Sequence, residues 1–529
     1  MYNIKLGTDK PDIDGMKRVV SKLMERGVRV NDCARLYRYY KDLSESLKYV
    51  ISSKYGIANP NSSKQVIGYI SELSATFDKN CKNEIIDICY DEQAGKWTSK
   101  AEALEKLSDL GYEFARELLD FRKASKYASY ISSFMDAADS KGLVHPKVSL
   151  TKTHRINYSE PGLMSIPKKL LWHMVAPYRE GDKLYSVDIK NQEPSILINM
   201  TGADSLKEAL TNEQGLYETL FKKCFEPKVT ANVLLDTFLE DRRYSFKEIE
   251  ALGTVSPIKY HPVRADFDGL YYKGERVVNL ETVCIGSSKG VKADLPNSVL
   301  IGTDKGNTYR VKVTWDEASA EKFAKSKSVD YSIEGKLTGF DVRISKAARK
   351  EFKTAWNAIS YGASCAGVES MCKVIDGKKT YKFITQIDEL KQYRSMVAKW
   401  ARAGHRGLNT FFGTYVHAGN EASGRALERI LLDLPIQGTG ADILSLLIKR
   451  FYDYRKEHGL TGKMWLYYSR HDELIIEVDG DWESEVGQQE VENILRDMLE
   501  HQIEDWEPFK LEVGPVNAEE LGIEDDDEQ

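Results

Sequence analysis

The stretch Tyr467-Tyr-Ser-Arg-His-Asp-Glu-Leu-Ile-Ile-Glu-Val-Asp479 places His471, Asp472 and Glu473 between two runs that alternate as β-strands do. We therefore predict a hairpin with Asp472 at the bend and Glu473 exposed beside it. One face of the hairpin is expected to pack on a core through Leu466, Tyr468, Leu474, Ile476 and Val478. An aspartate in a turn is commonly only a turn former, so chemistry here requires a second carboxylate.

That second carboxylate is Asp188, which ends the strand-like run LYSVDI and is followed five residues later by Glu193. Two aspartates that are brought together repel each other unless cations lie between them. Carboxylate oxygens suit Mg²⁺, whose remaining ligands are commonly phosphate and water. Two ions about 3.5–4 Å apart form the known clamp for in-line phosphoryl displacement. The sequence thus predicts two Mg²⁺ ions held by Asp188 and Asp472, with Mn²⁺ as a possible substitute and Glu473 as a further candidate ligand.

A third group of residues follows helical spacing. On a helix, positions four apart form one stripe, and here the stripe consists of Arg349, Lys353, Asn357 and Tyr361. Apolar residues of the same segment are expected to face elsewhere: Phe352, Trp356 and Ile359. Arginine and lysine one turn apart can grip a polyphosphate, and a tyrosine ring can stack on a base. The simpler alternative is a solvated helix face that carries a basic pair.

In this order along the chain, the three groups resemble the motifs of the family-A, polymerase-I-like DNA polymerases. Asp188 with Glu193 is similar to the first catalytic motif, the series Arg349, Lys353, Tyr361 and Gly362 to the second, and His471-Asp472-Glu473 to the third. Further matches are Thr153-His-Arg155 with Glu160-Pro-Gly-Leu-Met-Ser-Ile-Pro167, Arg429 with Leu434-Pro-Ile-Gln437, Asn59-Pro-Asn-Ser-Ser-Lys-Gln65, Phe121-Arg-Lys-Ala-Ser-Lys126 and Phe509-Lys-Leu-Glu-Val-Gly514. The resemblance covers about residues 60–225 and 343–515.

The resemblance implies a role for each matched residue. Asp188 and Asp472 would hold the metal ions, while Arg349 and Lys353 would bind the incoming triphosphate, with Lys353 also placed to protonate the departing pyrophosphate. Tyr361 would pack at the nascent base pair, and Glu193 would crowd the sugar 2′ position. Contacts to primer-template DNA would come from Arg155, Arg429, Gln437 and His471.

The resemblance also implies a fold, which is an α+β right hand with palm, fingers and thumb. The expected segments are a helical lead (1–58), the thumb (59–150), the first part of the palm (151–225), a helical connector (226–253), an inserted β-rich module (254–342), the fingers (343–425), and the second part of the palm with an acidic tail (426–529). Too few residues precede the palm for a proofreading exonuclease domain, so we expect no proofreading by this chain.

The chain departs from the family pattern in three places. Asn357 stands where the family usually carries an aromatic residue, so sugar discrimination cannot be carried over. Lys190 and Asn191 make the first motif unusual. The 155 residues between Glu193 and Arg349 exceed what a finger base requires, and the β-rich segment accounts for most of the surplus.

The β-rich segment 254–342 is expected to be a small barrel or sandwich that docks single-stranded DNA or a replication protein. Candidate stacking residues are Tyr271, Tyr272, Tyr309 and Trp315. The alternative is that these aromatic side chains only fill a small core.

Bulk composition sets the remaining bounds. The chain has 529 residues, 42% of them hydrophobic, and a net charge of -6, of which the acidic end GIEDDDEQ supplies most. Charge alone therefore does not exclude a nucleic-acid partner. Neither a signal pattern nor a long apolar run is found, so we expect a cytoplasmic protein of a bacterium or a phage-infected cell, with no membrane contact.

Two other functions are compatible with these residues. A single-subunit RNA polymerase shares the metal aspartates and the basic helix, although Glu193 and the His-Asp-Glu triplet favour a DNA enzyme. A replication factor that binds nucleic acid without catalysis is the other, and the presence of Asp188, Asp472, Arg349 and Lys353 argues against it.

Overall fold

In the computed structural model, the described residues are 4–5, 10–76, 85–91, 95–212, 215–225, 228–235, 243–244, 261–262, 269–281, 283–287, 290–325, 330–503 and 505–516. The acidic tail and most of the expected connector lie outside them. The chain forms two compact units. The first comprises residues 1–190, 438–504 and 509–529, and the second comprises residues 191–437 and 505–508.

A four-stranded antiparallel sheet is the centre of the first unit. Its strands stand in the order β22, β23, β9, β25. Their bounds are Lys183–Ile189 for β9, Met464–Arg470 for β22, Glu473–Val478 for β23 and Leu511–Pro515 for β25. Residues distant in sequence therefore become neighbours through backbone pairing, with β9 between β23 and β25.

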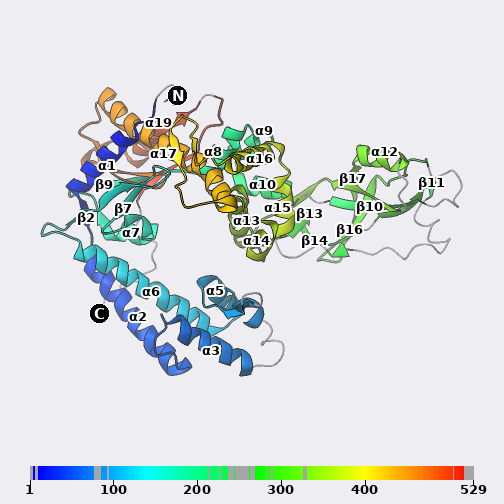
Figure 1. The fold of residues 1–529 in the computed structure, drawn as a ribbon, viewed down its shortest axis with the longest axis horizontal. Helices are drawn as coiled ribbons and strands as arrows, with labels where there is room; N and C mark the ends of the chain where they lie inside the picture. Colours follow the sequence, from blue (N-terminus) through cyan, green and yellow to red (C-terminus); the bar gives the residue numbers. More distant parts are fainter. Residues whose placement is uncertain are drawn as a thin grey trace. The chain divides into compact units, whose positions relative to one another are not determined.

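Both faces of the β22–β23 hairpin are covered, not one. Every residue of β23 is buried, and in β22 only Trp465 is half-buried. Helix α1 (Ile13–Arg26) packs on β22, and α19 (Gln488–Leu499) packs on β25. Figure 1 labels both helices in the region of β9, the neighbour of β25 in this sheet. The alternating pattern identified the residues of one face, but it could not reveal that helices from both ends of the chain enclose the sheet.

The first unit contains further short elements, of which β3 and β4 pair with each other. They are β1 (Ile4–Lys5), β2 (Val28–Val30), β3 (Tyr90–Asp91), β4 (Lys96–Trp97), β5 (Leu143–Val144), β6 (Lys147–Leu150), β7 (Ile156–Ser159), a 3₁₀ turn (Leu163–Ser165), α7 (Lys168–Met174), β8 (Val175–Ala176), α18 (Gly480–Val486) and β24 (His501–Gln502). Strands β6 and β7 form a hairpin, and β2 pairs with both β5 and β8.

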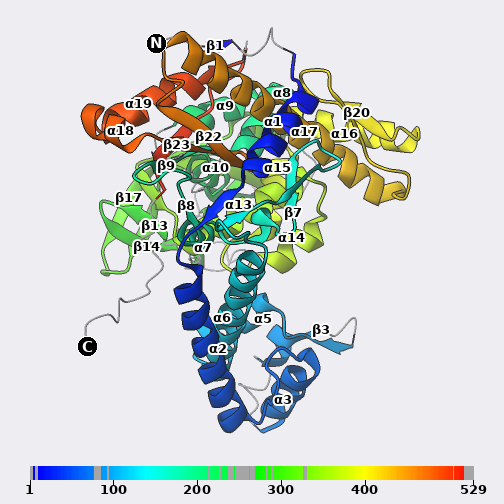
Figure 2. The same cartoon turned by 90° about the vertical axis from the view of Figure 1, so that its left-hand side faces the viewer.

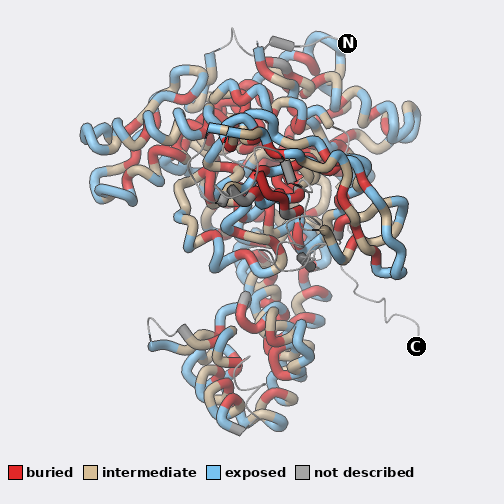
Figure 3. Tube along the Cα trace, turned by 90° about the vertical axis from the view of Figure 1, so that its right-hand side faces the viewer, coloured by how far each residue is buried: buried red, intermediate tan, exposed pale blue. Residues whose placement is uncertain are grey.

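Two long helices, α2 (Cys33–Tyr55) and α6 (Glu113–Asp136), pack along each other in the same unit (Figure 2). Asp32 caps the start of α2 by accepting a hydrogen bond from the Arg35 amide, and Gly56 ends it in the left-handed region. Shorter helices complete this group, namely α3 (Ser63–Thr76) and α5 (Ala101–Asp109). The buried residues of the group lie where its helices face each other (Figure 3). The expected boundary at residue 58 therefore separates α2 from the helix on which it packs.

The second unit begins with three helices that follow β9 in the sequence: α8 (Gln192–Thr201), α9 (Asp204–Thr211) and α10 (Leu216–Cys224). Its later elements are α13 (Lys346–Ser360), α14 (Cys365–Met371), α15 (Gly377–Thr385), α16 (Asp388–Arg402), β20 (Gly407–Asn409), β21 (Tyr415–His417) and the first part of α17 (Gly424–Glu457). Ser345 caps α13 through the Ala348 amide. Helix α13 packs on α10, where the Phe221 and Phe352 rings lie 5.6 Å apart.

The predicted β-rich insertion is present and begins earlier than expected. Strand β10 (Lys228–Leu235) lies where the sequence predicted a helical connector. Its buried residues Val229, Ala231 and Val233 alternate with exposed ones, which is the period of a strand and not of a helix. Hydrophobic composition alone did not distinguish the two.

The insertion forms one sheet in the described residues, in the order β11, β15, β10, β18, β17, β16, β14, β13, β19, with β12 beside β14. The strands are β11 (Arg243–Tyr244), β12 (His261–Pro262), β13 (Gly269–Tyr272), β14 (Glu275–Leu280), β15 (Val283–Ser287), β16 (Ser298–Thr303), β17 (Thr308–Trp315), β18 (Asp330–Leu337) and β19 (Phe340–Arg343). Helix α12 (Glu317–Lys325) packs against β18, burying Ala320 and Phe323.

The aromatic residues proposed for stacking are engaged within the insertion. Tyr272 lies 5.5 Å from the Tyr309 ring and 5.2 Å from that of Phe340. The Trp315 indole N–H donates to the Pro296 carbonyl at 2.5 Å. These contacts support the alternative in which the aromatic side chains build the module itself. Binding of single-stranded DNA or a replication protein there stays a prediction.

One helix in the described part of the chain, α17, is long and apolar enough to cross a membrane. However, 83% of its most apolar stretch of 18 residues is buried inside the protein, as expected for a core helix. Pro435 lies inside α17, and the helix continues on both sides of it.

We predict a pH-dependent loss of stability from His501. This ring is buried, stacks on Phe509 at 4.9 Å, and donates through Nδ1 to the Leu499 carbonyl. Burial lowers the pKa of His501 from 6.5 to about 4. Between these two pKa values the unfolded chain binds a proton at His501 that the folded chain excludes. The folded state is therefore most stable, as far as His501 is concerned, above pH 6.5, and it loses stability as the pH falls to about 4. The loss amounts to about 3 kcal/mol.

The variant His501→Phe keeps the ring and removes the proton site. The unfolding free energy of both proteins is measured by denaturant unfolding from pH 7 to pH 4. On acidification, the wild type is expected to lose more stability than the variant. A constant difference across this range would contradict the prediction.

Candidate active site

The strand register of the first unit brings the acidic residues of two motifs together. Asp188 pairs directly with Glu473 across β9 and β23, and the Ile189 amide donates to the Asp472 carbonyl at 3.4 Å. Directly opposed residues in antiparallel strands have Cα atoms about 4.5–5.5 Å apart. Asp472 is half-buried and lies one residue beyond this pair. The two carboxylates expected to converge thus come from adjacent ends of paired strands.

The bend of the hairpin has an unusual backbone. Residues His471 and Asp472 link β22 to β23, and His471 has a φ of 53°. A two-residue hairpin loop favours glycine at such a position, because a side chain there is strained. His471 is exposed, so packing does not explain its presence. A strained side chain beside Asp472 indicates a functional constraint.

Glu473 differs from the sequence expectation. It was expected to be exposed at the bend, but it is the first residue of β23 and only 3% exposed. Its carboxylate accepts a hydrogen bond from the Ser186 hydroxyl and pairs with Lys168 at 2.7 Å. Burial raises the pKa of Glu473, although Lys168 opposes that shift. The partners that accompany this burial come from β9 and α7, which are distant in sequence, so the local pattern of the hairpin does not show them.

Lys168 is the residue that sequence reasoning missed. Its ammonium lies 3.0 Å from Asp188 Oδ2 as well as 2.7 Å from Glu473 Oε1. Burial by itself lowers the pKa of Lys168, but the two carboxylates outweigh it and the pKa is raised. The only signal in the sequence was a lysine directly after Ile166-Pro167 in a segment that matches the family.

The start of α7, where Lys168 lies, is held by the hairpin. Arg470 is buried, and its Nη2 donates to the Ile166 carbonyl at 2.6 Å. The Tyr158 hydroxyl donates to the Ser469 carbonyl at 2.9 Å. The segment that precedes the first motif is therefore fixed to the strand that precedes the third.

The second unit contains the basic stripe on α13. Phe352, Trp356 and Ile359 are buried, which confirms that they face away from it, while Arg349 and Lys353 are exposed. The Arg349 guanidinium lies 5.8 Å and the Lys353 ammonium 5.6 Å from the centre of the same buried ring, that of Tyr217. Arg349 Nε also donates to the Glu218 carboxylate. Tyr217 and Glu218 were not predicted, because they lie on α10 and no spacing rule links them to α13.

The end of α13 connects two further candidates. The Tyr361 hydroxyl donates to Glu193 Oε2 at 2.6 Å, so the base-pair and sugar residues implied by the resemblance contact each other. Gly362 has a φ of 86°, and a Cβ there would lie 3.1 Å from Leu432 and 3.2 Å from Arg429. Only glycine allows this close approach between the end of α13 and α17. Asn357 is half-buried on the same stripe.

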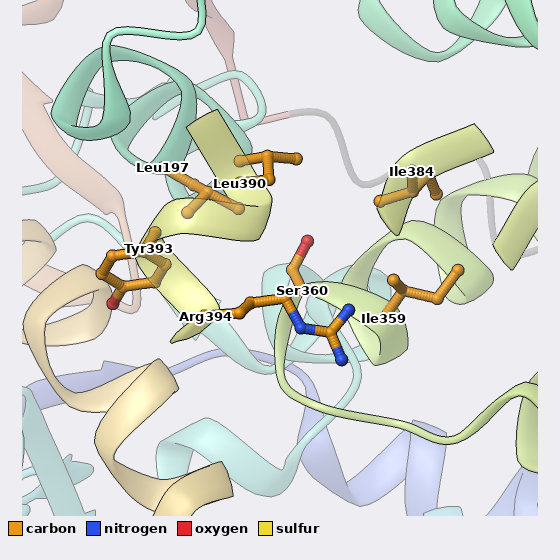
Figure 4. A pocket seen from close by; sticks show the side chains of 7 residues that line it. All are labelled: Leu197, Ile359, Ser360, Ile384, Leu390, Tyr393 and Arg394. Carbon is orange, nitrogen blue, oxygen red and sulfur yellow. The ribbon is translucent and has the colours of Figure 1, made fainter. Parts of the chain in front are cut away.

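A cavity lies beside the end of α13 (Figure 4). It measures about 10 Å³ and is lined by Leu197, Ile359, Ser360, Ile384, Leu390, Tyr393 and Arg394. In the part of the chain that the structure describes, the Ser360 hydroxyl and Arg394 Nη1 are buried without a hydrogen-bond partner. The space suits one water molecule that can accept from both groups, and it is far too small for a nucleotide.

The candidate DNA contacts are divided between the units. Arg155 precedes β7 and is half-buried, and His471 is exposed, both in the first unit. Arg429 is exposed and Gln437 half-buried, and both lie on the part of α17 that belongs to the second unit.

A metal ion fits the acidic strand ends by their chemistry. Asp188 and Glu473 already hold one cation, the Lys168 ammonium, and carboxylate oxygens are the ligands that Mg²⁺ prefers. Within the described ranges, no group of three or more His, Cys, Asp or Glu side chains is arranged to hold a metal ion. Ions bound by Asp188 and Asp472 would therefore take further ligands from water and substrate phosphate, as Mg²⁺ commonly does.

Comparison with known proteins decides the family. The model of DNA polymerase family A matches residues 33–249 and 313–516, which is most of the chain and includes every motif described above. The chain belongs to DNA polymerase family A. The family-A resemblance predicted from the motifs is thereby confirmed.

Curated relatives in this family are DNA polymerase I proteins. That of Caldicellulosiruptor bescii is 28% identical over 195 residues, which cover 35% of this chain and 23% of the relative. That of Rhizobium leguminosarum is 29% identical over 132 residues, covering 22% of this chain and 12% of the relative. The matched region thus spans less than a quarter of the length of either relative.

A solved polymerase structure supports the fold. The POL domain of Pol1 from M. smegmatis, in complex with DNA primer-template and dNTP, matches 95% of this chain and 69% of its own with a TM-score of 0.59 and 17% identity. The expected right-hand polymerase fold is confirmed. The family match leaves out residues 250–312, which are the middle part of the β-rich insertion.

We predict that His471→Gly stabilises the protein and weakens its activity. Removal of a strained side chain at φ 53° relieves about 1 kcal/mol, so the midpoint of thermal unfolding should rise. Primer extension should fall, because the side chain beside Asp472 is lost. The matched control is Lys273→Gly, which has a φ of 50° in the β13–β14 turn and should gain stability with no change in extension. A lower unfolding midpoint for His471→Gly would refute the strain argument.

Proposed function

We propose that this chain is a template-directed DNA polymerase that extends a primer 3′ end with dNTPs by two-metal phosphoryl transfer and releases pyrophosphate. The observation that carries the proposal is the β9–β23 register, which sets Asp188 opposite Glu473 and beside Asp472. Membership in family A and the basic stripe on α13 support it. Proofreading by this chain is not expected, and that expectation stays a prediction.

The acidic residues at the ends of β9 and β23 would bind the metal ions. Asp188 and Asp472 would hold Mg²⁺ ions, whose chemistry is to activate the primer hydroxyl and to neutralise charge on the phosphate oxygens. Glu473 would not act as a direct ligand, because its buried carboxylate is already bonded to Ser186 and Lys168. Its hydrogen bond from the Ser186 hydroxyl would join the ends of β9 and β23.

The basic stripe on α13 would bind the triphosphate of the incoming nucleotide. Arg349 and Lys353 lie one helical turn apart on an exposed face, and the Tyr217 ring below them limits where their cationic ends can lie. Positioned cations of this kind bind phosphate oxygens and stabilise charge that develops on them. Lys353 would give a proton to the leaving pyrophosphate, for which an exposed ammonium is suited.

Glu193 and Tyr361 provide selectivity for the sugar. The hydrogen bond of 2.6 Å from the Tyr361 hydroxyl fixes one carboxylate oxygen of Glu193. A carboxylate held in this way has a defined position and can exclude a 2′-hydroxyl sterically. Tyr361 would stack at the nascent base pair with its ring, and Asn357 would line the same nucleotide site.

Four residues are proposed to contact primer-template DNA. Arg155 would contact the backbone, where arginine neutralises phosphate charge. His471, Arg429 and Gln437 would contact the primer terminus or the minor-groove edge; His471 and Arg429 are exposed, and Gln437 is half-buried. A salt-dependent affinity for DNA is expected from such contacts.

The test of the proposed function is primer extension on a labelled primer-template with Mg²⁺. Wild-type protein is expected to add dNTPs according to the template. Asp472→Asn should lower the rate at least about a thousandfold, because a neutral amide cannot hold the cations that stabilise the developing charge. Retained DNA binding by the variant, measured by fluorescence anisotropy, shows that the loss is catalytic.

Two outcomes of this test favour the alternative functions. Preferential addition of rNTPs by the wild type would indicate an RNA polymerase. DNA binding with no extension by any nucleotide would indicate a replication factor without catalysis.

We predict that Glu193→Ala relaxes sugar selectivity. Removing the carboxylate leaves space at the sugar, so the ratio of kcat/KM for dNTP to that for rNTP should fall about 10–100-fold. Glu193→Gln has the same size and should retain most of the ratio, which separates a steric effect from one of charge. An unchanged ratio in Glu193→Ala would show that selectivity lies elsewhere.

A further inference from the structure

Lys168 occupies the position of a cation between two carboxylates of the candidate active site. Its Nζ lies 3.0 Å from Asp188 Oδ2 and 2.7 Å from Glu473 Oε1. The Glu473 side chain is 4% exposed and that of Asp188 is 30% exposed, so water screens this contact only in part. The two ion pairs of Lys168 are therefore partly buried and stronger than ion pairs on an exposed surface.

The sheet register explains why a cation is needed there. Asp188 pairs with Glu473 on one side and with Glu512 on the other. Opposed residues in antiparallel strands project from the same face, so three carboxylates lie side by side. Adjacent like charges destabilise such a sheet. The Lys168 ammonium offsets the repulsion between Asp188 and Glu473, as does the hydrogen bond from Ser186 to Glu473, while Lys190 pairs with Glu512 at 3.5 Å.

The position of Lys168 is built into the fold. Pro167 precedes the first residue of α7, and buried Arg470 binds the Ile166 carbonyl at 2.6 Å. The Lys168 ammonium also lies 5.1 Å from the Trp172 ring centre. The backbone before Lys168 is thus tied to the hairpin, and the ammonium lies near the Trp172 ring and the two carboxylates.

We propose that Lys168 is an internal counter-ion that competes with divalent metal for the acidic strand ends and keeps Glu473 out of metal coordination. This inference rests on the proposed function, because it assumes that Asp188 and Asp472 bind the metal. A metal ion that approaches Asp188 meets a fixed positive charge, which weakens binding by the protein alone. Triphosphate oxygens would then be needed for tight metal binding, so the metal would bind most tightly together with the nucleotide.

The experiment measures Mn²⁺ binding to the full chain without DNA or nucleotide, from the electron paramagnetic resonance signal of free Mn²⁺. Lys168→Met should bind Mn²⁺ about tenfold more tightly than wild type, since a unit charge within a few ångströms has gone. Lys168→Arg keeps the charge and should bind as wild type does. Glu473→Gln should bind more weakly, and the double variant Lys168→Met/Glu473→Gln should return close to wild type.

The matched control is Lys183→Met. Lys183 lies at the other end of β9 and pairs with buried Glu483 at 2.6 Å, so the substitution breaks a similar pair with the same change in charge. Its Mn²⁺ affinity should equal that of wild type. Thermal unfolding provides a second readout, in which Lys168→Met is less stable in EDTA but gains more from added Mn²⁺ than wild type does.

The outcomes separate the two proposals. If Asp188→Asn and Asp472→Asn each abolish Mn²⁺ binding but Lys168→Met binds no more tightly than wild type, the counter-ion inference is overturned and the proposed function stands. If Mn²⁺ binding by the wild type does not depend on the two aspartates, both are overturned. Tighter binding by Lys168→Met alone, with Lys183→Met unchanged, supports the inference.

Discussion

The antiparallel pairing of β9 with β23 is the constraint on which the candidate active site depends. A side-chain period of two means that a shift of one residue would turn every side chain of a strand to the other face. Here the register is fixed by burial on both faces, because nearly all residues of β22, β23 and β9 are enclosed. A shift would break the close packing around buried side chains such as Tyr185, Val187 and Ile476. Hydrophobic packing thus positions Asp188 and Asp472, although neither side chain packs in the core.

Several of the candidate functional side chains have an oppositely charged or hydrogen-bonded partner within their own unit. Lys168 compensates Asp188 and Glu473, Glu218 compensates Arg349, and Tyr361 binds Glu193. Such partners orient a side chain and reduce the cost of holding charge partly out of water. They also make ligand binding an exchange of partners rather than a simple addition of contacts. For Arg349, a phosphate would compete with the Glu218 carboxylate for the same guanidinium.

The β-rich insertion does not disturb the packing of the helices before and after it, because its two ends lie at neighbouring helices. It follows α10 and ends at Arg343, just before α13 begins at Lys346. Helices α10 and α13 pack on each other through Phe221 and Phe352. The two ends of the insertion therefore join elements that are already neighbours, a situation in which added chain is tolerated. Lys222 extends this connection by pairing with Asp341 of β19 at 3.7 Å.

The sequence by itself determined the motifs, the helical stripe and the presence of a β-rich insertion, because these depend on local spacing. The buried positions of Phe352, Trp356 and Ile359 follow from the period of a helix, and the family follows from motif order. Tertiary structure alone decided the burial of Glu473, the contact of Lys168 with two carboxylates, and the pairing of Arg349 with Glu218. These partners are distant in sequence, and only the folded backbone makes them neighbours. The strand β10 is an intermediate case, since its alternation was present in the sequence but too short to outweigh the helical texture expected there.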